Sequence, residues 1–345
     1  MTAMAILLYH LIQLKTLLTK SNNMKINKNG RYTMKIINVK QGSAEWLEWR
    51  HRGIAATDAA SIMDSNPYAS PLDVYFDKIS DTPKHIEPNA AMEWGSRIEA
   101  LLVSKFMEMH PDATNLETSQ LYESDDNPYN RASLDAECDC DSRHSIIECK
   151  TGSSLDKWFK PDGGESVPMN YYHQVQWQML VTGYTHTYFS VLVNGREWFE
   201  RSIDADPMCQ AMLIQRCAEM QKHIANHEQP APSLAHAESD LKLMAMKHTD
   251  TDDEAPSVSD DLYARYSKAK SFADAATSTV EALKLEIMQM LGNHKCLMFG
   301  NRKFASIVSR KGSVKLSDAI VKAQFPEVYG KCLITTAPSR YLKVM

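Results

Sequence analysis

Two short apolar stretches carry the charged side chains whose types and spacing best suit chemistry. Asp135 ends the first stretch, and Glu148 and Lys150 alternate along the second. Because successive side chains of a strand point to opposite faces, Glu148 and Lys150 share one face. A hairpin through residues 138–145 would place Asp135 beside Glu148. Two carboxylates and an ammonium group at one place suit a site where acids hold a divalent metal and a lysine meets developing negative charge. A surface strand with solvated charges would show the same pattern.

Helices predicted on both sides of these strands add further polar groups. Upstream, apolar residues at helical spacing predict a helix over residues 94–106, with Glu99 against its apolar face. These apolar residues are Ile98, Leu102, Phe106 and Met109. Downstream, a proline and a glycine bound a second predicted helix, 168–183, on which Gln174 and Gln178 share a face. The order helix-Glu, strand-Asp, strand-Glu-x-Lys, helix-Gln is more specific than any one of these pieces.

In this order the chain resembles the lambda-exonuclease-like (YqaJ) viral recombinase nucleases of the PD-(D/E)xK superfamily. The matching segments are 45–50, 53–59, 95–99, 133–135, 148–150 and 172–176. Leu134 and Ala136 stand where the family commonly has proline and glycine, and the spacing from Asp135 to Glu148 is longer than in the phage archetype. These departures lengthen a hairpin and leave the acids in place.

The resemblance implies a 5′→3′ exonuclease that degrades one strand of linear double-stranded DNA. The 3′ single-stranded tails that remain would serve phage-type homologous recombination. Two alternatives stay open: a restriction or repair endonuclease of the same superfamily, and a catalytically silent DNA-binding protein. Cleavage of covalently closed circles would favour the first alternative, and Mg²⁺-dependent cleavage would dispose of the second.

The resemblance also implies roles for single residues. The implied metal ligands are Glu99, Asp135, Glu148 and the backbone carbonyl of Cys149. They would hold Mg²⁺, for which Mn²⁺ can substitute. Lys150 would orient or deprotonate the attacking water, or offset charge on the phosphorus. Gln174 would orient the lysine or the phosphate.

A candidate phosphate site precedes this motif. Arg50 offers a planar fork suited to phosphate oxygens, and Thr57 can cap a helix that begins at Asp58. The N-terminus of a helix also favours anions. The residues alone fit equally a packed tryptophan pair, a capping threonine and a surface arginine. The resemblance favours a pocket for the DNA 5′-phosphate at Arg50 and Thr57.

A loop over residues 153–167 follows the Glu-x-Lys strand and should lie at the mouth of the site. Its candidates for DNA contacts are Lys157, Trp158 and Lys160. Lysines can meet backbone phosphates, and a tryptophan can stack on a base. A lid with Trp158 packed down against the domain is the alternative.

Composition fits a globular enzyme of 345 residues, with 43% hydrophobic and 23% charged residues. The seven scattered cysteines indicate reduced thiols in a cytosol, and Cys138, Cys140 and Cys149 lack a fourth ligand at suitable spacing for a metal or iron–sulfur site. We therefore expect a cytoplasmic protein of a bacterial host, encoded by a phage or prophage, with no membrane partner. The expected partners are double-stranded DNA ends, a phage single-strand-annealing protein and further copies of this chain in a ring-shaped trimer. The net charge of −5 does not by itself indicate nucleic-acid binding.

The chain divides into four predicted segments. Residues 1–33 form a dispensable leader or a membrane-surface helix, since their apolar core is too short to span a bilayer. Residues 34–228 form the nuclease domain, an α/β (α+β) fold with a restriction-nuclease-like mixed β-sheet flanked by helices. Residues 229–258 form an acidic, proline-containing linker. Residues 259–345 form a C-terminal module with a long helix and a small basic β-hairpin.

Within the C-terminal module, apolar residues at alternating spacings of three and four give a narrow stripe of coiled-coil type. The stripe suits packing on the nuclease domain or pairing with another subunit. A hairpin over residues 295–309 follows, with six basic residues and no acid from Lys295 to Ser317. This run fits either a solvated face or a ribbon that contacts duplex DNA.

Overall fold

The computed structural model describes residues 34–83, 89–160, 162–249, 255–309 and 318–332. The predicted leader and part of the basic run lie outside the described residues. The chain separates into two compact units, with the division between Lys247 and His248. The first unit contains the mixed sheet and the second contains the long helix and the hairpin.

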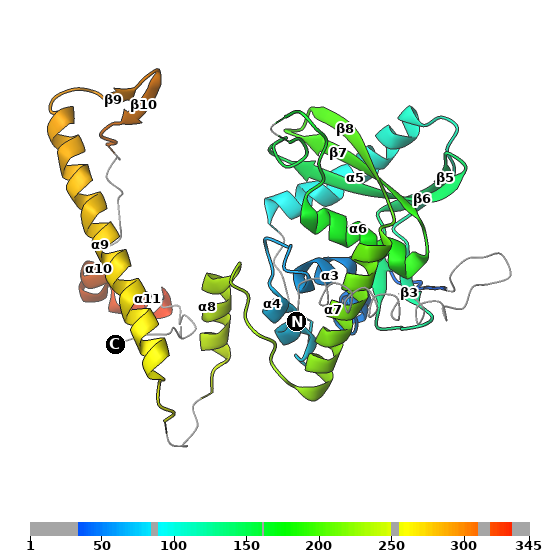
Figure 1. Ribbon diagram of the computed structural model, residues 1–345, viewed down its shortest axis with the longest axis horizontal. Coiled ribbons are helices and arrows are strands. Elements are labelled where there is room, and N and C mark those ends of the chain that lie inside the picture. The colour runs from blue at the N-terminus through cyan, green and yellow to red at the C-terminus, as the bar shows by residue number, and fades with distance from the viewer. Residues whose placement is uncertain (1–33, 84–88, 161, 250–254, 310–317, 333–345) are drawn as a thin grey trace, which may run out of the picture. The chain divides into compact units, whose positions relative to one another are not determined.

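A five-stranded sheet forms the centre of the first unit, in the order β2-β5-β6-β7-β8 (Figure 1). Its strands are β2 (Thr114–Thr118), β5 (Ala136–Cys140), β6 (Arg143–Gly152), β7 (His186–Val193) and β8 (Glu197–Asp204). Only β6 and β7 pair in parallel within this sheet. A parallel pair needs a crossover, which α6 (Met169–Thr182) supplies. The strand order confirms the predicted mixed sheet.

Helices cover both faces of this sheet. Neighbouring residues of β7 point to opposite faces: Tyr188 packs with Phe106 of α5 (Ala90–Met109), whereas Phe189 joins the cluster that holds Trp177 of α6. All four side chains are buried. The alternation is the period of two that a strand imposes. α7 (Pro207–Asn226) packs against α6 and completes that layer.

A second, three-stranded sheet leads into the first. Its order is β1-β3-β4, with β1 (Met34–Ile36), β3 (Leu121–Ser124) and β4 (Arg131–Ser133) all antiparallel. Leu134 and Asp135 connect β4 to β5 of the larger sheet. Three short helices, α2 (Ala44–His51), α3 (Ala56–Ile62) and α4 (Pro71–Lys78), precede α5 in the chain. Asp135 therefore lies where the two sheets meet in the chain.

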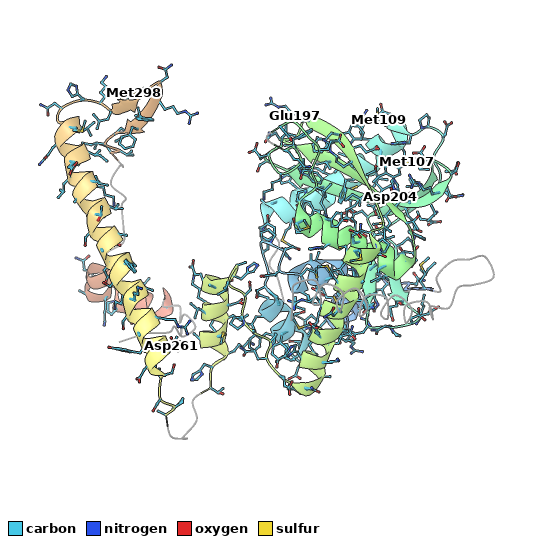
Figure 2. The ribbon with its side chains drawn as sticks, viewed as in Figure 1. Met107, Met109, Glu197, Asp204, Asp261 and Met298 are labelled. Atoms are coloured by element: carbon cyan, nitrogen blue, oxygen red, sulfur yellow. The ribbon has the colours of Figure 1, made fainter. Side chains whose placement is uncertain are left out.

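Two turns have the geometry that the sequence predicts. Asn194 and Gly195 have φ values of 53° and 70°, as required for the central residues of the turn between β7 and β8. Gly183 caps α6 with φ of 71°. The turn also places the end of β8, Asp204, near the start of β7. The first and last residues of β8, Glu197 and Asp204, are labelled in Figure 2.

Two predictions about elements are wrong. Thr57 does not cap a helix, because α3 begins at Ala56, two residues before the predicted start at Asp58, and the carboxylate of Asp58 accepts the Ala55 N–H. The predicted linker contains a helix, α8 (Ala237–Lys247). Leu243 and Met244 of α8 pack against the main core, so an amphipathic face is formed within a segment that its prolines and acids mark as a linker.

The second unit consists of a long helix, a β-hairpin and two short helices within the described residues. It contains α9 (Asp260–Leu291), β9 (Leu297–Phe299), β10 (Arg302–Ala305), α10 (Asp318–Gln324) and α11 (Pro326–Cys332). Ser259 caps α9 by accepting the Leu262 N–H. The stripe on α9 and apolar residues of the hairpin, such as Met298, are exposed within the described residues (Figure 2). The long helix and the hairpin confirm the predicted elements, although both strands are shorter than expected.

Candidate functional site

One cleft of about 510 Å³ in the first unit gathers most of the residues that the sequence singles out. Elements far apart in the chain supply its walls: α2, α3, α5, β6, α6 and the link between β4 and β5. The predicted site residues that line it are Arg50, Thr57, Glu99, Asp135, Glu148, Cys149, Lys150 and Gln174. The structure thus places the candidate acids, the lysine and the candidate phosphate site around one space.

Glu148 is the most enclosed acid of the cleft, with 1% of its surface exposed. Its Oε1 accepts hydrogen bonds from Lys150 Nζ and from Gln174 Nε2, each at 2.5 Å. Its Oε2 accepts one from Gln178 Nε2 at 2.9 Å. Burying a carboxylate is costly unless donors replace water, and these three groups meet that need. The strand period therefore puts Glu148 and Lys150 on one face, toward α6, as predicted.

Asp135 lies beside Glu148, also as predicted. Ala136, the first residue of β5, pairs with Ile147 in the β5–β6 register, so Asp135 just before β5 lies next to Glu148. Asp135 Oδ2 accepts the Cys149 N–H at 2.8 Å. Burial, followed by the negative charges of Glu148 and Glu99, raises the pKa of Asp135 well above its usual range. The opposing effects of Lys150 and of the Cys149 hydrogen bond do not cancel this rise.

Glu99 reaches the same cleft from α5. Burial raises the pKa of Glu99, and the charge of Glu148 raises it further against the opposing effect of Lys150. The thiol of Cys149 also donates to the Glu99 backbone carbonyl at 3.7 Å. The carboxylates of Glu99 in α5 and Glu148 in β6 therefore repel each other, which is unfavourable unless a cation lies close to both.

Lys150 is fixed between the acids and an aromatic ring. Its side chain is 17% exposed, and its Nζ lies 4.7 Å from the centroid of the Tyr171 ring. Burial alone would lower the pKa of Lys150, but Glu148 and Asp135 raise it above its usual range. The lysine is therefore an ammonium ion at neutral pH, and it carries a positive charge into the cleft.

Arg50 and Thr57 form a second polar group on the wall of the cleft. Arg50 Nη2 donates to Thr57 Oγ1 at 2.7 Å, and the guanidinium lies 4.8 Å from the Trp46 ring centroid. Both contacts hold the fork in one orientation. Although burial would raise the pKa of nearby Asp58, Lys78 and Arg50 lower it, so this acid is paired within the domain. Thr57 thus positions the arginine, and does not cap the helix.

The loop candidates do not share this cleft. Trp158 is 3% exposed and packs with Tyr171, Phe189 and Phe199. Its prediction as a DNA contact is wrong, because the ring would have to leave the core to stack on a base. Lys157 and Lys160 are exposed, and Lys160 lines a separate hollow with Leu155, Asp156 and Phe159. The packed-down alternative for the loop describes Trp158.

The donor set suits a hard divalent cation. Among the residues that the structure describes, no three acidic, histidine or cysteine side chains stand close enough to hold a metal ion as they are placed. Glu148 is turned toward Lys150 and the two glutamines. Asp135 and Glu99 supply carboxylate oxygens, and burial and the charge of Glu148 raise the pKa of each. Oxygen ligands of this kind are those that Mg²⁺ and Mn²⁺ prefer.

Two residues of the site carry roles that the sequence did not predict. Gln178 binds Glu148 and also donates to the Ser133 carbonyl at 3.0 Å, so it ties α6 to β4 and β6. Its position four residues after Gln174 was the available signal. The ring of Tyr171, one helical turn before Gln174, contacts Lys150, and the only available signal was its place on the same predicted helix.

Comparison with known proteins finds similarity over the segment that contains most of these site residues. Residues 45–185 match the family model of the YqaJ-like viral recombinase domain. In this segment the chain is therefore similar to that family. The YqaJ-like domain spans the cleft from Arg50 to Gln174. The resemblance predicted from the sequence is thereby confirmed for this segment.

Other similarities extend beyond the YqaJ-like domain. The uncharacterized protein YqaJ of Bacillus subtilis (strain 168) is 23% identical over 304 residues, which cover 85% of this chain and 92% of that protein. An alkaline exonuclease (LHK-Exo) from Laribacter hongkongensis has 19% identity and a TM-score of 0.45, covering 54% of this chain and 94% of its own. A phage-related exonuclease from Haemophilus somnus 129PT has 11% identity and a TM-score of 0.39, covering 52% of this chain and 97% of its own.

Proposed function

We propose that this protein is a Mg²⁺-dependent 5′→3′ exonuclease that degrades one strand of linear double-stranded DNA. The 3′ single-stranded tails that it leaves would enter phage-type homologous recombination. One observation carries the proposal: the acids Glu99, Asp135 and Glu148 share a cleft with Lys150 and with Arg50. Clustered acids suit a metal-assisted phosphodiester hydrolysis, and the two cations suit a phosphate substrate.

In this proposal Asp135, Glu148 and Glu99 hold the divalent cation, together with the backbone carbonyl of Cys149. Once bound, the ion supplies Lewis-acid stabilisation of the scissile phosphate. Lys150 directs its ammonium group at the charge that develops on the phosphate oxygens or at the attacking water. Its contact with Glu148 at 2.5 Å and its place over Tyr171 keep it at that position.

The glutamines hold the acid rather than react. Gln174 and Gln178 donate to different oxygens of Glu148, so the carboxylate cannot rotate without losing one of these bonds. Gln174 also lines the cleft, where its amide can turn from Glu148 to a phosphate oxygen. In this way α6 orients the reacting groups of β6.

Arg50 reads the end of the DNA in this proposal. Its guanidinium is held by Thr57 and Trp46 and presents its remaining N–H groups to the cleft that contains the acids. Because α3 has only seven residues, its N-terminus offers a weak partial charge, and the guanidinium of Arg50 makes the main interaction with the 5′-phosphate. A bidentate arginine–phosphate contact is strong and directional.

The proposed partners follow from the same function. They are double-stranded DNA ends, a phage single-strand-annealing protein that takes over the 3′ strand, and further copies of this chain in a ring that encloses DNA. Residues 34–228 would form the nuclease, 229–258 a connecting segment whose helix α8 packs on the first unit, and 259–345 a separate module. Lys157 and Lys160 remain candidates for contacts with backbone phosphates because both are exposed.

A digestion series tests this proposal. The full chain is incubated with 5′-phosphorylated linear duplex, 5′-hydroxyl linear duplex, closed circular duplex and single strand, each with and without Mg²⁺. We expect rapid, Mg²⁺-dependent release of nucleotides from the 5′-phosphorylated linear duplex, and slow or no release from the other three substrates. Arg50→Ala should slow that substrate by about 10- to 150-fold, the equivalent of a hydrogen bond to a charged group, and change the 5′-hydroxyl duplex little.

Two outcomes would contradict the proposal. Efficient cutting of closed circles would identify an endonuclease, since no end is needed. Equal loss of rate on both linear duplexes in Arg50→Ala would show that the arginine does not read the phosphate. A conservative Arg50→Lys variant serves as the matched control, because it keeps the charge and loses the bidentate fork.

A further inference from the structure

Tyr68 is an exposed aromatic residue on the wall of the cleft. It lies between α3 and α4 and is 84% exposed, yet it lines the same space as Asp135 and Arg50. An isolated exposed aromatic on a protein surface needs no explanation. An exposed ring that borders a cleft with acids and arginine is different, because anything that enters the cleft passes beside it.

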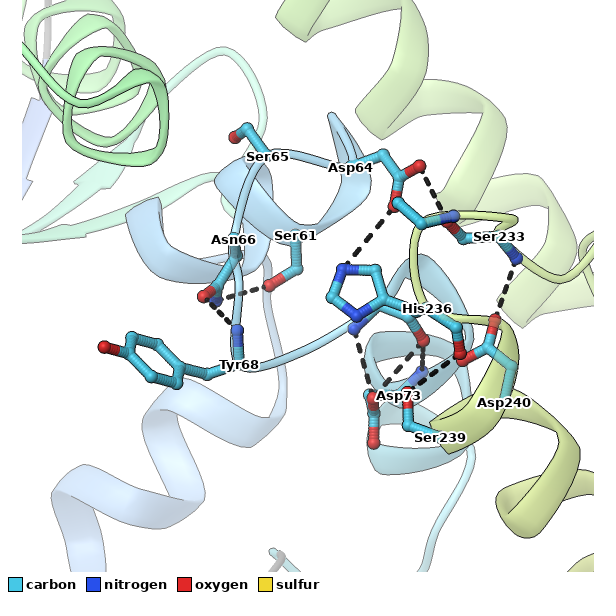
Figure 3. A network of polar contacts seen from close by, with 12 residues as sticks. Ser61, Asp64, Ser65, Asn66, Tyr68, Asp73, Ser233, His236, Ser239 and Asp240 are labelled. Atoms are coloured by element: carbon cyan, nitrogen blue, oxygen red, sulfur yellow. Dashed lines mark hydrogen bonds and ion pairs between the residues drawn. The ribbon is translucent and has the colours of Figure 1, made fainter. Parts of the chain in front are cut away.

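The backbone that carries Tyr68 is fixed from inside the loop. Asn66 Oδ1 accepts the Tyr68 N–H at 3.0 Å, and Asn66 Nδ2 donates to Ser61 Oγ at 2.9 Å. Between them, Pro67 restricts its own φ. The side-chain amide of Asn66 thus ties the loop to the end of α3. The ring of Tyr68 points away from these contacts (Figure 3).

A segment from much later in the chain braces the same loop. Ser233 Oγ donates to Asp64 Oδ2 at 2.7 Å, and His236 Nε2 lies 3.7 Å from Asp64 Oδ1. Asp240 of α8 is buried and accepts the Ser233 N–H at 2.8 Å (Figure 3). Asp64 itself has a φ of 57°, in the left-handed region that aspartate and asparagine enter more often than other residues with a side chain. The loop is therefore held on both sides while the ring of Tyr68 stays exposed.

We propose that Tyr68 is a base-stacking residue of this cleft. Its ring packs on a nucleobase of the DNA end whose phosphate backbone lies toward Asp135 and Arg50. Stacking on an aromatic ring accepts any base, because each base has a π face. The bonds around Asn66 and Asp64 hold the backbone at Tyr68, so the loop loses little conformational entropy when the ring stacks on a base. The inference rests on the proposed nuclease function.

The test uses 5′-phosphorylated duplexes with 2-aminopurine at each of the first positions from the 5′ end. The full chain binds them with Ca²⁺ in place of Mg²⁺, so that binding is measured without cleavage. We expect the wild type and Tyr68→Phe to quench 2-aminopurine at one position, since both rings stack. Tyr68→Ala should lose that quenching and bind about 5- to 150-fold more weakly, the scale for one base–aromatic stack. Because Tyr68 is 84% exposed, Tyr68→Ala should keep the far-UV circular dichroism and Tm of the wild type.

A matched control is Tyr263→Ala, which removes an exposed tyrosine from α9 and should behave as the wild type. Unchanged affinity and quenching in Tyr68→Ala would overturn the inference, as would a Tyr68→Phe variant that fails like Tyr68→Ala. Cleavage of the same duplexes by the wild type in Mg²⁺ is measured in parallel. Absence of wild-type cleavage counts against the proposed nuclease function, whereas cleavage with unchanged Tyr68→Ala binding counts against stacking alone.

Discussion

At the scale of single residues, the negatively charged form of Asp135 is destabilised in the cleft. Burial and the charges of Glu148 and Glu99 raise its pKa, whereas Lys150 opposes the rise. Because the folded-state pKa lies above the unfolded value, the folded protein holds more protons than the unfolded chain between those two values. Stability then falls as pH rises through that interval, and the penalty is complete above the folded pKa.

Asp135→Asn should therefore raise the Tm of the metal-free protein at neutral pH. The amide removes the charge and keeps an oxygen to accept the Cys149 N–H. The gain should shrink as pH falls below the raised pKa and vanish below the ordinary carboxyl range. Thermal unfolding followed by circular dichroism from pH 4 to pH 8 measures this. Asp112→Asn, at an exposed acid, is the control. A lower Tm in Asp135→Asn at neutral pH would contradict the description of the site.

At the scale of elements, periodicity and register predict most of what positions the site. The Glu148–Lys150 strand and the helix with Gln174 follow from local patterns, and β5–β6 pairing then brings in Asp135. The sequence cannot show which face of a loop becomes buried. Trp158 sits in a glycine- and lysine-containing loop, and only the aromatic side chains of β7, β8 and α6 reveal that it packs. α8 was missed because the prolines and acids of its segment predict a linker.

Trp158→Ala should act on stability and not specifically on DNA affinity. Removing a buried tryptophan costs about 3–5 kcal/mol, because transfer and cavity terms add. Lys157→Ala, next to it and exposed, should change the free energy of unfolding by less than about 0.5 kcal/mol. Urea unfolding at equilibrium measures both values. A Trp158→Ala protein as stable as the wild type but weaker in DNA binding would restore the tryptophan as a DNA contact.

At the scale of the whole molecule, the second unit exposes apolar and basic side chains that bear on assembly. None of the helices within the described residues is long and apolar enough to cross a membrane. Large apolar side chains of α9, such as Leu262, Val280 and Leu283, are exposed along a stripe of coiled-coil type. The hairpin adds exposed Phe299 beside Arg302 in the β9–β10 register. The second unit therefore carries exposed apolar and basic side chains, and we propose that the apolar stripe suits association and that the basic groups suit contact with DNA.

Truncation at about Ser257 separates two ways of staying on DNA. If a ring formed by the nuclease domain provides processivity, the truncated protein should remain oligomeric by light scattering and digest long duplexes at moderate salt. We expect this result. A monomeric or distributive product would assign assembly or retention to the second unit. In that case binding by the basic hairpin should weaken steeply with salt, since released counterions drive it.

The most direct test of the proposed metal-dependent site is the rate of digestion of a 5′-phosphorylated linear duplex in Mg²⁺, compared between wild type and Asp135→Asn. Binding of the same duplex in Ca²⁺ and the Tm of each protein are measured alongside. We predict that Asp135→Asn remains folded and binds DNA, yet digests it at least about 10²-fold more slowly, the scale for removing one group that stabilises charge in the transition state. Digestion by Asp135→Asn at the wild-type rate would contradict the assignment of this cleft as the active site.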